Sequence, residues 1–223
     1  SAGLMDQLQP FDVVSFTGSA ETAAVIRSHR AVAQRSVRVN IEADSINSAL
    51  LLHGEEAGGA AFELLVKEVA REMTVKSGQK CTAIRRVFVP EALFDAAAQA
   101  LSARLAKTTL GNPRDESVRM GALVNRAQMV AVQEGLAQLK TQTEVLHDGA
   151  SHTLVGADPA LACCTGPTLL GLRTAAQSDA ANLVHETEVF GPVATLVACR
   201  SAEHALDLVR RGQGSLVTSL YGS

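Results

Sequence analysis

One cysteine in this chain stands where its thiol could act as a nucleophile. Cys81 belongs to the segment Ser77-Gly78-Gln79-Lys80-Cys81-Thr82, just after a long amphipathic helical pattern. The reactive form of cysteine is the thiolate, which nearby cations favour. Lys80, Arg85 and Arg86 make this neighbourhood electropositive in sequence. The alternative interpretation is a structural thiol, since free cysteine is often buried.

A carboxylate that could activate water lies upstream. Glu42 follows the alternating segment 37–41, which predicts a strand that ends at this residue. The carboxyl ends of parallel strands often present functional groups, and a positioned carboxylate can take a proton from water as a general base. Asp44 is a rival for that role. The alternative is an ordinary solvated glutamate at a strand end.

Two further segments suit parts of a dinucleotide. Thr17-Gly18-Ser19 joins a strand pattern to a helix pattern, so the Ser19 hydroxyl and the helix N-terminus could hold phosphate. It is not a complete Gly-x-Gly-x-x-Gly fingerprint, and a plain helix cap is the alternative. Glu188 and Phe190 lie in a loop closed by Gly191-Pro192, where they could meet a ribose and a flat ring. A surface glutamate beside a core phenylalanine is the alternative there.

Together these groups suit the oxidation of an aldehyde through a covalent thioester. Hydride leaves more easily from the tetrahedral adduct of a thiolate than from a free carbonyl. A hydride acceptor must lie close to that adduct, and a carboxylate must then activate the water that releases the acid. We therefore expect Cys81 to be the nucleophile and Glu42 the base.

Composition narrows the class of protein. The chain has 223 residues, 47% of them hydrophobic, which is enough for one large core or two small ones. A net charge of −3 and an aromatic content of 3% argue against a nucleic-acid surface. No apolar stretch approaches the ~18 residues of a membrane helix, and the first residues do not resemble a signal peptide. The 4 cysteines show neither a disulfide framework nor zinc-ligand spacing, so we expect a cytoplasmic protein without a bound metal.

Strand and helix patterns alternate along the chain, which is typical of an α/β domain with a largely parallel sheet. The strand patterns fall at residues 12–16, 37–41, 47–52, 86–89, 144–146, 168–170, 193–198 and 215–220. The helix patterns fall at residues 21–33, 60–76, 93–106, 127–140 and 202–210.

The motifs, in their order, resemble the aldehyde dehydrogenase superfamily from about Phe11 to the C-terminus. The matching segments are Phe16-Thr17-Gly18-Ser19, Glu42, Gly78-Gln79-Lys80-Cys81, Gly111-Asn112-Pro113 with Met120-Gly121, and Glu188-Val189-Phe190-Gly191-Pro192. The run Glu42-Ala43-Asp44-Ser45 departs from the common Glu-Leu-Gly-Gly-Lys. That departure concerns the local geometry near Glu42 and not its identity.

The resemblance implies a role for each candidate residue. Cys81 would be the nucleophile, with its backbone N–H in the oxyanion hole, and Glu42 would be the general base. The turn Thr17-Gly18-Ser19 would bind the cofactor, with Ser19 touching the pyrophosphate, while Glu188 would contact the ribose and Phe190 the nicotinamide. Members that pass the acyl group to coenzyme A tend to lack the glutamate, so its presence implies release to water.

The variants around Glu42 and Cys81 resemble a bacterial branch of the family that degrades aromatic compounds aerobically. Within it we expect benzoate rather than phenylacetate degradation. The resemblance then implies an aldehyde carried on a coenzyme A thioester as substrate, and NADP, or else NAD, as cofactor. It also implies a homodimer or higher homo-oligomer, with neither nucleic acid nor membrane as a partner.

The expected fold is a three-layer, aldehyde dehydrogenase-like α/β arrangement, as a fragment of a larger two-domain enzyme. Residues 1–42 would be the C-terminal part of the dinucleotide-binding domain, and residues 43–223 a catalytic domain incomplete at its C-terminus. Because the resemblance places the adenine-binding strands before Ser1, we expect the isolated chain to be inactive. A thiol acyltransferase and a non-catalytic α/β domain are the two alternatives, although none of the 6 histidines forms a motif with Cys81.

Overall fold

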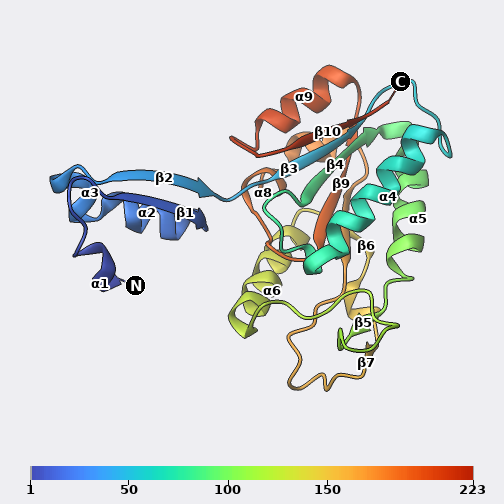
Figure 1. Ribbon diagram of the computed structural model, residues 1–223. Coiled ribbons are helices and arrows are strands. Elements are labelled where there is room, and N and C mark those ends of the chain that lie inside the picture. Colours follow the sequence, from blue (N-terminus) through green and yellow to red (C-terminus); the bar gives the residue numbers. More distant parts are fainter. Residues whose placement is uncertain (1, 223) are drawn as a thin grey trace. The chain divides into compact units, whose positions relative to one another are not determined.

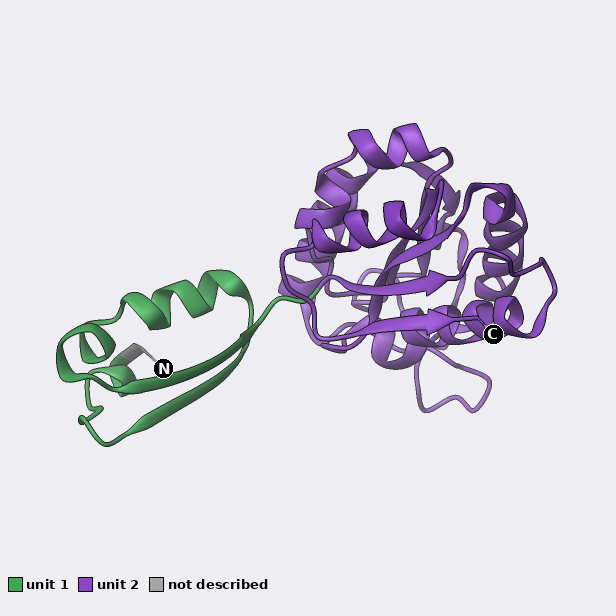
Figure 2. Ribbon diagram, turned by 90° about the horizontal axis from the view of Figure 1, so that it is seen from above, with its two compact units in different colours: residues 1–45 green, residues 46–223 purple. Residues whose placement is uncertain are grey.

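The chain is an α/β protein, seen here in a computed structural model that describes residues 2–222. It divides into two compact units, residues 1–45 and residues 46–223 (Figures 1 and 2). Each unit is considered by itself. Compactness does not assign a role to either unit, so the division into a cofactor domain and a catalytic domain after Glu42 stays a prediction.

The smaller unit is built on two parallel strands with helices between them. Its elements are α1 (Ala2–Met5), β1 (Val13–Gly18), α2 (Ala20–Ser28), α3 (Arg30–Arg35) and β2 (Arg38–Ala43). The single helix predicted over residues 21–33 is wrong, because the backbone of His29 is extended and divides it. The His29 ring then caps the second helix, since its Nδ1 accepts a hydrogen bond from the Ala31 N–H at 3.2 Å.

The larger unit contains a six-stranded sheet in the order β10-β3-β4-β9-β8-β6. The pairs are parallel except for β6, which runs antiparallel to β8. The strands are β3 (Asn47–Leu51), β4 (Ile84–Pro90), β6 (Glu144–His147), β8 (Thr168–Leu172), β9 (Val193–Cys199) and β10 (Thr218–Tyr221).

Helices cover both faces of this sheet and form two hydrophobic cores (Figure 1). The first core packs α4 (Ala60–Thr74) and α5 (Phe94–Leu105) on one face, and α6 (Arg126–Lys140), α8 (Leu183–Glu186) and α9 (Ala202–Arg210) contribute to the second. The helix α7 (Ala175–Ala180) is joined to β9 by the Ser178 hydroxyl, which donates to the Ala198 carbonyl at 2.8 Å. The three layers and the mostly parallel sheet confirm the predicted fold class.

Short elements complete the larger unit, and the sequence patterns did not predict several of them. They are the 3₁₀ turns η1 (Val75–Gly78), η2 (Glu91–Leu93) and η3 (Gly149–Ser151), and the two-residue strands β5 (Leu110–Gly111) and β7 (Leu154–Val155), which pair in parallel. Across residues 2–222, no helix has the length and apolar character that a membrane span requires.

Candidate active site

The candidate residues of the larger unit gather at the amino ends of neighbouring parallel strands. Cys81 lies just before β4, and Glu188 lies on the loop that precedes β9, the next strand in the sheet. Asn47 begins β3, on the other side of β4. Parallel sheets more often present functional groups at their carboxyl ends, and Glu42 follows that pattern at the end of β2 in the smaller unit.

The Cys81 thiol is exposed, on a turn that begins with unusual backbone geometry. The helix α4 ends at Thr74, two residues before the predicted end. Lys76, Ser77 and Gly78 then follow with φ of 53°, 54° and 69°. Left-handed backbone costs a non-glycine residue roughly 1–2 kcal/mol, so this segment needs contacts from outside to persist.

Several of those contacts come from segments distant in sequence. The Ser77 hydroxyl donates to the Gly121 carbonyl at 2.8 Å. The Gln79 side chain donates to the Lys76 carbonyl at 3.0 Å and accepts from the Val124 N–H at 3.0 Å. Gly78 is required twice over, by its positive φ and because a β-carbon there would collide with the carbonyl of Gly191 on the Glu188 loop.

Asn47 fixes the backbone of Cys81, the predicted nucleophile. Its Nδ2 donates to the carbonyls of Cys81 at 2.7 Å and Ala83 at 3.1 Å. Its Oδ1 accepts from the N–H groups of Leu216 at 3.0 Å and Val217 at 2.8 Å. All the hydrogen-bonding capacity of a fully buried amide is thereby used. The sequence signal for this positioning role was a polar residue at the start of an apolar strand pattern. The sequence analysis did not single out Asn47.

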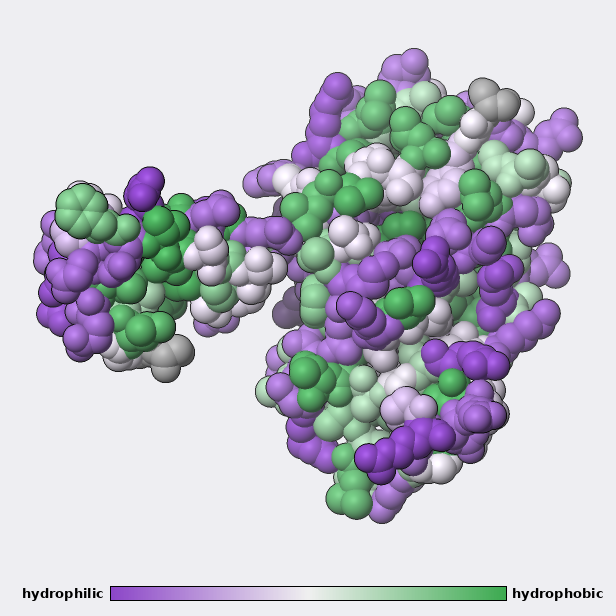
Figure 3. Space-filling view, viewed as in Figure 1, coloured by the Kyte–Doolittle hydropathy of each residue, from purple (hydrophilic) through white to green (hydrophobic). Residues whose placement is uncertain are grey.

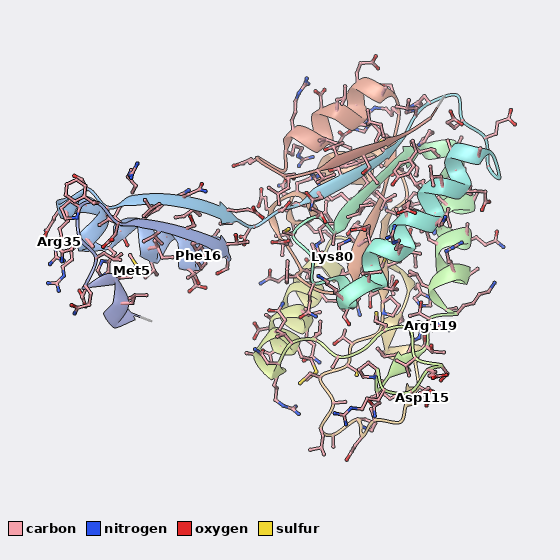
Figure 4. All side chains as sticks on the ribbon, viewed as in Figure 1. Met5, Phe16, Arg35, Lys80, Asp115 and Arg119 are labelled. Atoms are coloured by element: carbon pink, nitrogen blue, oxygen red, sulfur yellow. The ribbon has the colours of Figure 1, made fainter. Side chains whose placement is uncertain are left out.

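The three cations near Cys81 in sequence are engaged elsewhere. The Lys80 ammonium pairs with the Glu72 carboxylate at 2.6 Å, and Lys80 is labelled in Figure 4. Arg86 donates to the carbonyls of Ile46 and Leu208, both at 3.0 Å, and Arg85 to other carbonyls described below. The expectation that these side chains form an electropositive setting for the thiol therefore finds no support in their contacts.

The Glu188 loop carries a carboxylate and an aromatic ring side by side in sequence. The Glu188 side chain is 10% exposed, and its Oε1 lies 3.8 Å from Arg85 Nε. Phe190 is 36% exposed, with the Arg85 guanidinium carbon 5.5 Å from its ring centroid. The Gln128 side chain, at the start of α6, donates to the Phe190 carbonyl at 2.8 Å.

In the smaller unit, strand register brings the predicted residues together. Thr17 pairs with Glu42 across β1 and β2, and Ser19 follows as the N-cap of α2, its hydroxyl accepting from the Thr22 N–H at 3.3 Å. Asp44 has φ of 44°, and its carboxylate accepts from the Ala20 N–H at 3.0 Å. That bond gives Asp44 a capping task and favours Glu42 over Asp44 as the base.

Among the candidate residues, Glu188 and Phe190 best suit a nicotinamide dinucleotide, at the ribose and the nicotinamide ring of that ligand. Glu188 offers a carboxylate to sugar hydroxyls, and the partly exposed ring of Phe190 offers an apolar face. At the other candidate contact, the Asp44 carboxylate takes up one N–H of the first turn of α2, beside Ser19. The fit to phosphate there is therefore weaker than the fit to the sugar.

An open hollow in the smaller unit takes no part in this arrangement. It measures about 590 Å³ and is lined mainly by alanines of α2, with Ile41 and Ala43 of β2. Apolar residues also show between polar ones on the face of this unit drawn in Figure 3. The lining contains neither a thiol nor a carboxylate, so we assign it no step of a reaction.

Comparison with known proteins gives one family and several relatives. The model of the aldehyde dehydrogenase family matches residues 4–223. The 3,4-dehydroadipyl-CoA semialdehyde dehydrogenase of Aromatoleum evansii is 51% identical over 219 residues, which cover 98% of this chain and 42% of the relative. The lactaldehyde dehydrogenase of Methanococcus vannielii is 23% identical over 215 residues, which cover 96% of this chain and 41% of that protein. The chain thus spans less than half the length of these curated relatives.

Solved structures show the same fold. The methylmalonate-semialdehyde dehydrogenase of Oceanimonas doudoroffii matches with a TM-score of 0.83 at 20% identity, covering 100% of this chain and 43% of that one. The betaine aldehyde dehydrogenase of Staphylococcus aureus, solved in complex with NAD+, matches with a TM-score of 0.81 at 23% identity, covering 95% of this chain and 39% of that one.

Proposed function

Since this chain belongs to the aldehyde dehydrogenase family, we propose that it oxidises an aldehyde to a carboxylic acid with a nicotinamide cofactor as hydride acceptor. One observation carries the proposal: Cys81 is the exposed one of the four free cysteines, and its backbone is held by a buried side chain. A fixed, accessible thiol is what nucleophilic catalysis needs.

Two of the other thiols are poor candidates for the nucleophile. Burial raises the pKa of the Cys199 thiol to about 12. Burial, with a smaller contribution from Cys163, also raises the pKa of the Cys164 thiol. A thiol that keeps its proton at neutral pH attacks carbonyl carbon poorly, because the thiolate is the nucleophile.

The proposed reaction has two halves, both on the Cys81 sulfur. The thiolate forms a C–S bond to the aldehyde carbon, and the electron pair of the C=O bond moves to oxygen. A bound, oxidised nicotinamide would supply the acceptor for the hydride of that carbon, and the C=O bond re-forms as a thioester. Glu42 takes a proton from water as its oxygen adds to the thioester carbon, after which the C–S bond breaks. The aldehyde is oxidised by two electrons, which the cofactor would accept with the hydride, and the Cys81 thiolate is restored.

We assign the remaining candidates to cofactor binding. The turn Thr17-Gly18-Ser19 would lie at the pyrophosphate, Glu188 would accept hydrogen bonds from a ribose, and Phe190 would pack beside the nicotinamide. The partial exposure of Phe190 and the position of Ser19 at the N-terminus of α2 support these roles. NADP and NAD are both compatible with these groups.

The substrate we propose is a semialdehyde carried on coenzyme A. The support is the 51% identity to 3,4-dehydroadipyl-CoA semialdehyde dehydrogenase over nearly the whole chain. From the cysteine content and the motif resemblance described in the sequence analysis, we also propose a cytoplasmic homo-oligomer that acts in the degradation of aromatic compounds such as benzoate. Release to water rather than to free coenzyme A follows from Glu42.

The first test compares the four thiols. Under native conditions, iodoacetamide should label Cys81 at least 10-fold faster than Cys163, Cys164 or Cys199, with site-specific rates read by mass spectrometry. A Cys81→Ser variant identifies the fast phase. Equal rates at all four thiols would contradict the assignment of the nucleophile.

The second test separates the two halves of the reaction. In an active protein that includes this chain, a Glu42→Gln variant should keep the burst of reduced cofactor while its steady turnover falls by roughly 10²–10⁴-fold, the usual contribution of a general base. An Asp44→Asn variant serves as the matched control and should keep its turnover. Loss of the burst itself in Glu42→Gln would count against the role of Glu42.

A further inference from the structure

We propose that Arg85 is a positioning residue that couples the Cys81 turn to the Glu188 loop, so that a ligand held by Glu188 is sensed at the nucleophile. The Cys81 turn is defined here as residues 76–82, and the Glu188 loop as residues 188–192. The ligand part of this inference rests on the proposed function, whereas the coupling between the two segments does not.

An irregularity in the sheet directs the Arg85 side chain. Asn47 pairs with Ile84 and the next residue, Ser48, pairs with Arg86, so the register between β3 and β4 skips Arg85. An extra residue of this kind is a β-bulge, which bends the strand and re-aims a side chain. Beyond the bulge, Arg86 and Phe88 lie on the face that packs against α9. Arg85 instead reaches the two loops at the amino end of β4.

Arg85 bonds both loops at once. Its Nη2 donates to the carbonyl of Gly78 in the Cys81 turn at 2.8 Å. Its Nη1 donates to the carbonyl of Gly191 in the Glu188 loop at 2.7 Å. One planar, rigid guanidinium therefore fixes the separation of the two segments, which a flexible ammonium could not do. A β-carbon on Gly78 would overlap the Gly191 carbonyl, so the backbones of the two segments also approach closely at that point.

The charge of Arg85 is directed toward the candidate cofactor contacts. The side chain is 5% exposed, and burial lowers its pKa to about 10, against the opposing effect of the Glu188 carboxylate. Arg85 is thus a cation at neutral pH, with Glu188 and the Phe190 ring as its neighbours.

One donor of Arg85 is unused. Its Nε is buried and makes no hydrogen bond within residues 2–222, and it lies 3.8 Å from Glu188 Oε1. Because N–H···O bonds are about 2.7–3.2 Å long, an approach of roughly 1 Å would complete this one. Ligand binding that moves the Glu188 carboxylate would therefore change the bonding of Arg85. The same guanidinium would transmit that change to Gly78, three residues before Cys81.

The test measures amide hydrogen exchange in both segments. In Arg85→Gln, exchange should accelerate at least 10-fold in the Cys81 turn and in the Glu188 loop together. The matched control is Arg86→Lys, since Arg86 is also buried but holds Ile46, Leu208 and Val209 instead. It should leave both segments unchanged while exchange rises near its own partners. Acceleration in only one segment of Arg85→Gln, or equally in the control, would overturn the coupling.

A second measurement uses NADP+ as the probe. In the wild type, NADP+ in large excess should slow exchange in both segments, because Glu188 and Phe190 would contact it even at low affinity. Arg85→Lys keeps the cation, and it replaces Arg85→Gln if that variant does not fold. In Arg85→Lys, NADP+ should still slow exchange in the Glu188 loop, but its slowing of exchange in the Cys81 turn should be at least 5-fold smaller than in the wild type. Undiminished protection of the turn would refute the proposal. If NADP+ protects neither segment of the wild type, the assigned cofactor site fails, and the ligand-free comparison still decides the role of Arg85.

Discussion

The hydrogen bonds that hold the candidate residues join positions close in sequence in the smaller unit and positions far apart in sequence in the larger unit. In the smaller unit, the hydrogen bond from Ala20 to Asp44 spans 24 positions and is exposed. In the larger unit, Arg85 reaches Gly191 across 106 positions, and Asn47 reaches Val217 across 170. Both of those side chains are buried.

This difference teaches where a substitution should do harm. Water replaces an exposed hydrogen bond at little cost, whereas a buried donor or acceptor that loses its partner pays its full desolvation penalty. The turn around Cys81 should therefore be sensitive to changes far away in sequence. The strand ends around Glu42 should respond mainly to changes close by.

Loss of Asn47 should have the largest effect. Asn47→Ala would remove four hydrogen bonds of a fully buried amide, of which the bond to Ala83 is buried and the bonds to Cys81, Leu216 and Val217 are part-buried. We expect the free energy of unfolding to fall by about 3–5 kcal/mol, measured by urea denaturation. A loss below about 1 kcal/mol would mean that water replaces these bonds, and the contrast between the units would then disappear.

Gly78→Ala should come next. The new β-carbon would meet the Gly191 carbonyl, at a residue whose φ of 69° already disfavours a side chain. We expect about 2–4 kcal/mol of destabilisation by thermal or urea unfolding, because strain and overlap add. Gly54→Ala is the matched control: Gly54 also has positive φ, but a β-carbon there meets nothing within 4 Å. Equal losses in the two variants would remove the close approach of Gly191 from the explanation.

A buried histidine, His185, makes the stability of the larger unit depend on pH. Burial, together with the nearby cations Arg86 and Arg211, lowers the pKa of His185 to about 3. Between pH 6.5 and about 3 the unfolded chain binds a proton that the folded chain does not, so stability is present above pH 6.5 and falls with acidification. The slope should approach about 1.4 kcal/mol per pH unit.

The control for this pH dependence is His185→Gln, which cannot take up the proton. Unfolding should be followed from pH 6.5 to pH 4.5, above the range where most carboxylates titrate. The variant should show a flatter profile than the wild type. Parallel profiles would exclude His185 as the cause.

The smallest effect is expected in the smaller unit. Asp44→Ala removes the bond to the Ala20 N–H but keeps the left-handed backbone, so we expect a loss of about 1 kcal/mol, read as exchange of the Ala20 amide. Asp44→Gly should cost less, because glycine relieves the backbone while it also loses the cap. A cost for Asp44→Ala as large as that for Asn47→Ala would contradict the division into local and long-range support.

Local signals account for what the sequence predicted well. The cap at Ser19, the strand that ends in Glu42 and the alternating order of helices and strands all depend on neighbours in the chain. The prediction of one helix over residues 21–33 is wrong at His29, where the helical hydrogen bonds are interrupted and the His29 ring caps the next helix. Propensity alone cannot anticipate that exchange.

Long-range bonds account for what the sequence did not predict. Lys80, Arg85 and Arg86 lie close to Cys81 in sequence, yet each bonds a carboxylate or carbonyl that only the fold brings near. Nothing in the order of residues indicated the bulge that separates Arg85 from Arg86. Similarly, the hydrogen-bond partners of Asn47 are far apart in sequence and are brought together only by the fold.

A protein engineer who shortens this chain must treat β10 as part of the support of the Cys81 turn. The Asn47 side chain donates a hydrogen bond to the Cys81 carbonyl and accepts hydrogen bonds from the N–H groups of Leu216 and Val217, which precede β10. Trimming before Leu216 would remove an edge strand and, in the same step, the two hydrogen bonds that hold the Asn47 side-chain oxygen in place. A tag attached downstream of Tyr221 spares that connection, whereas an insertion between Arg210 and Leu216 would strain it.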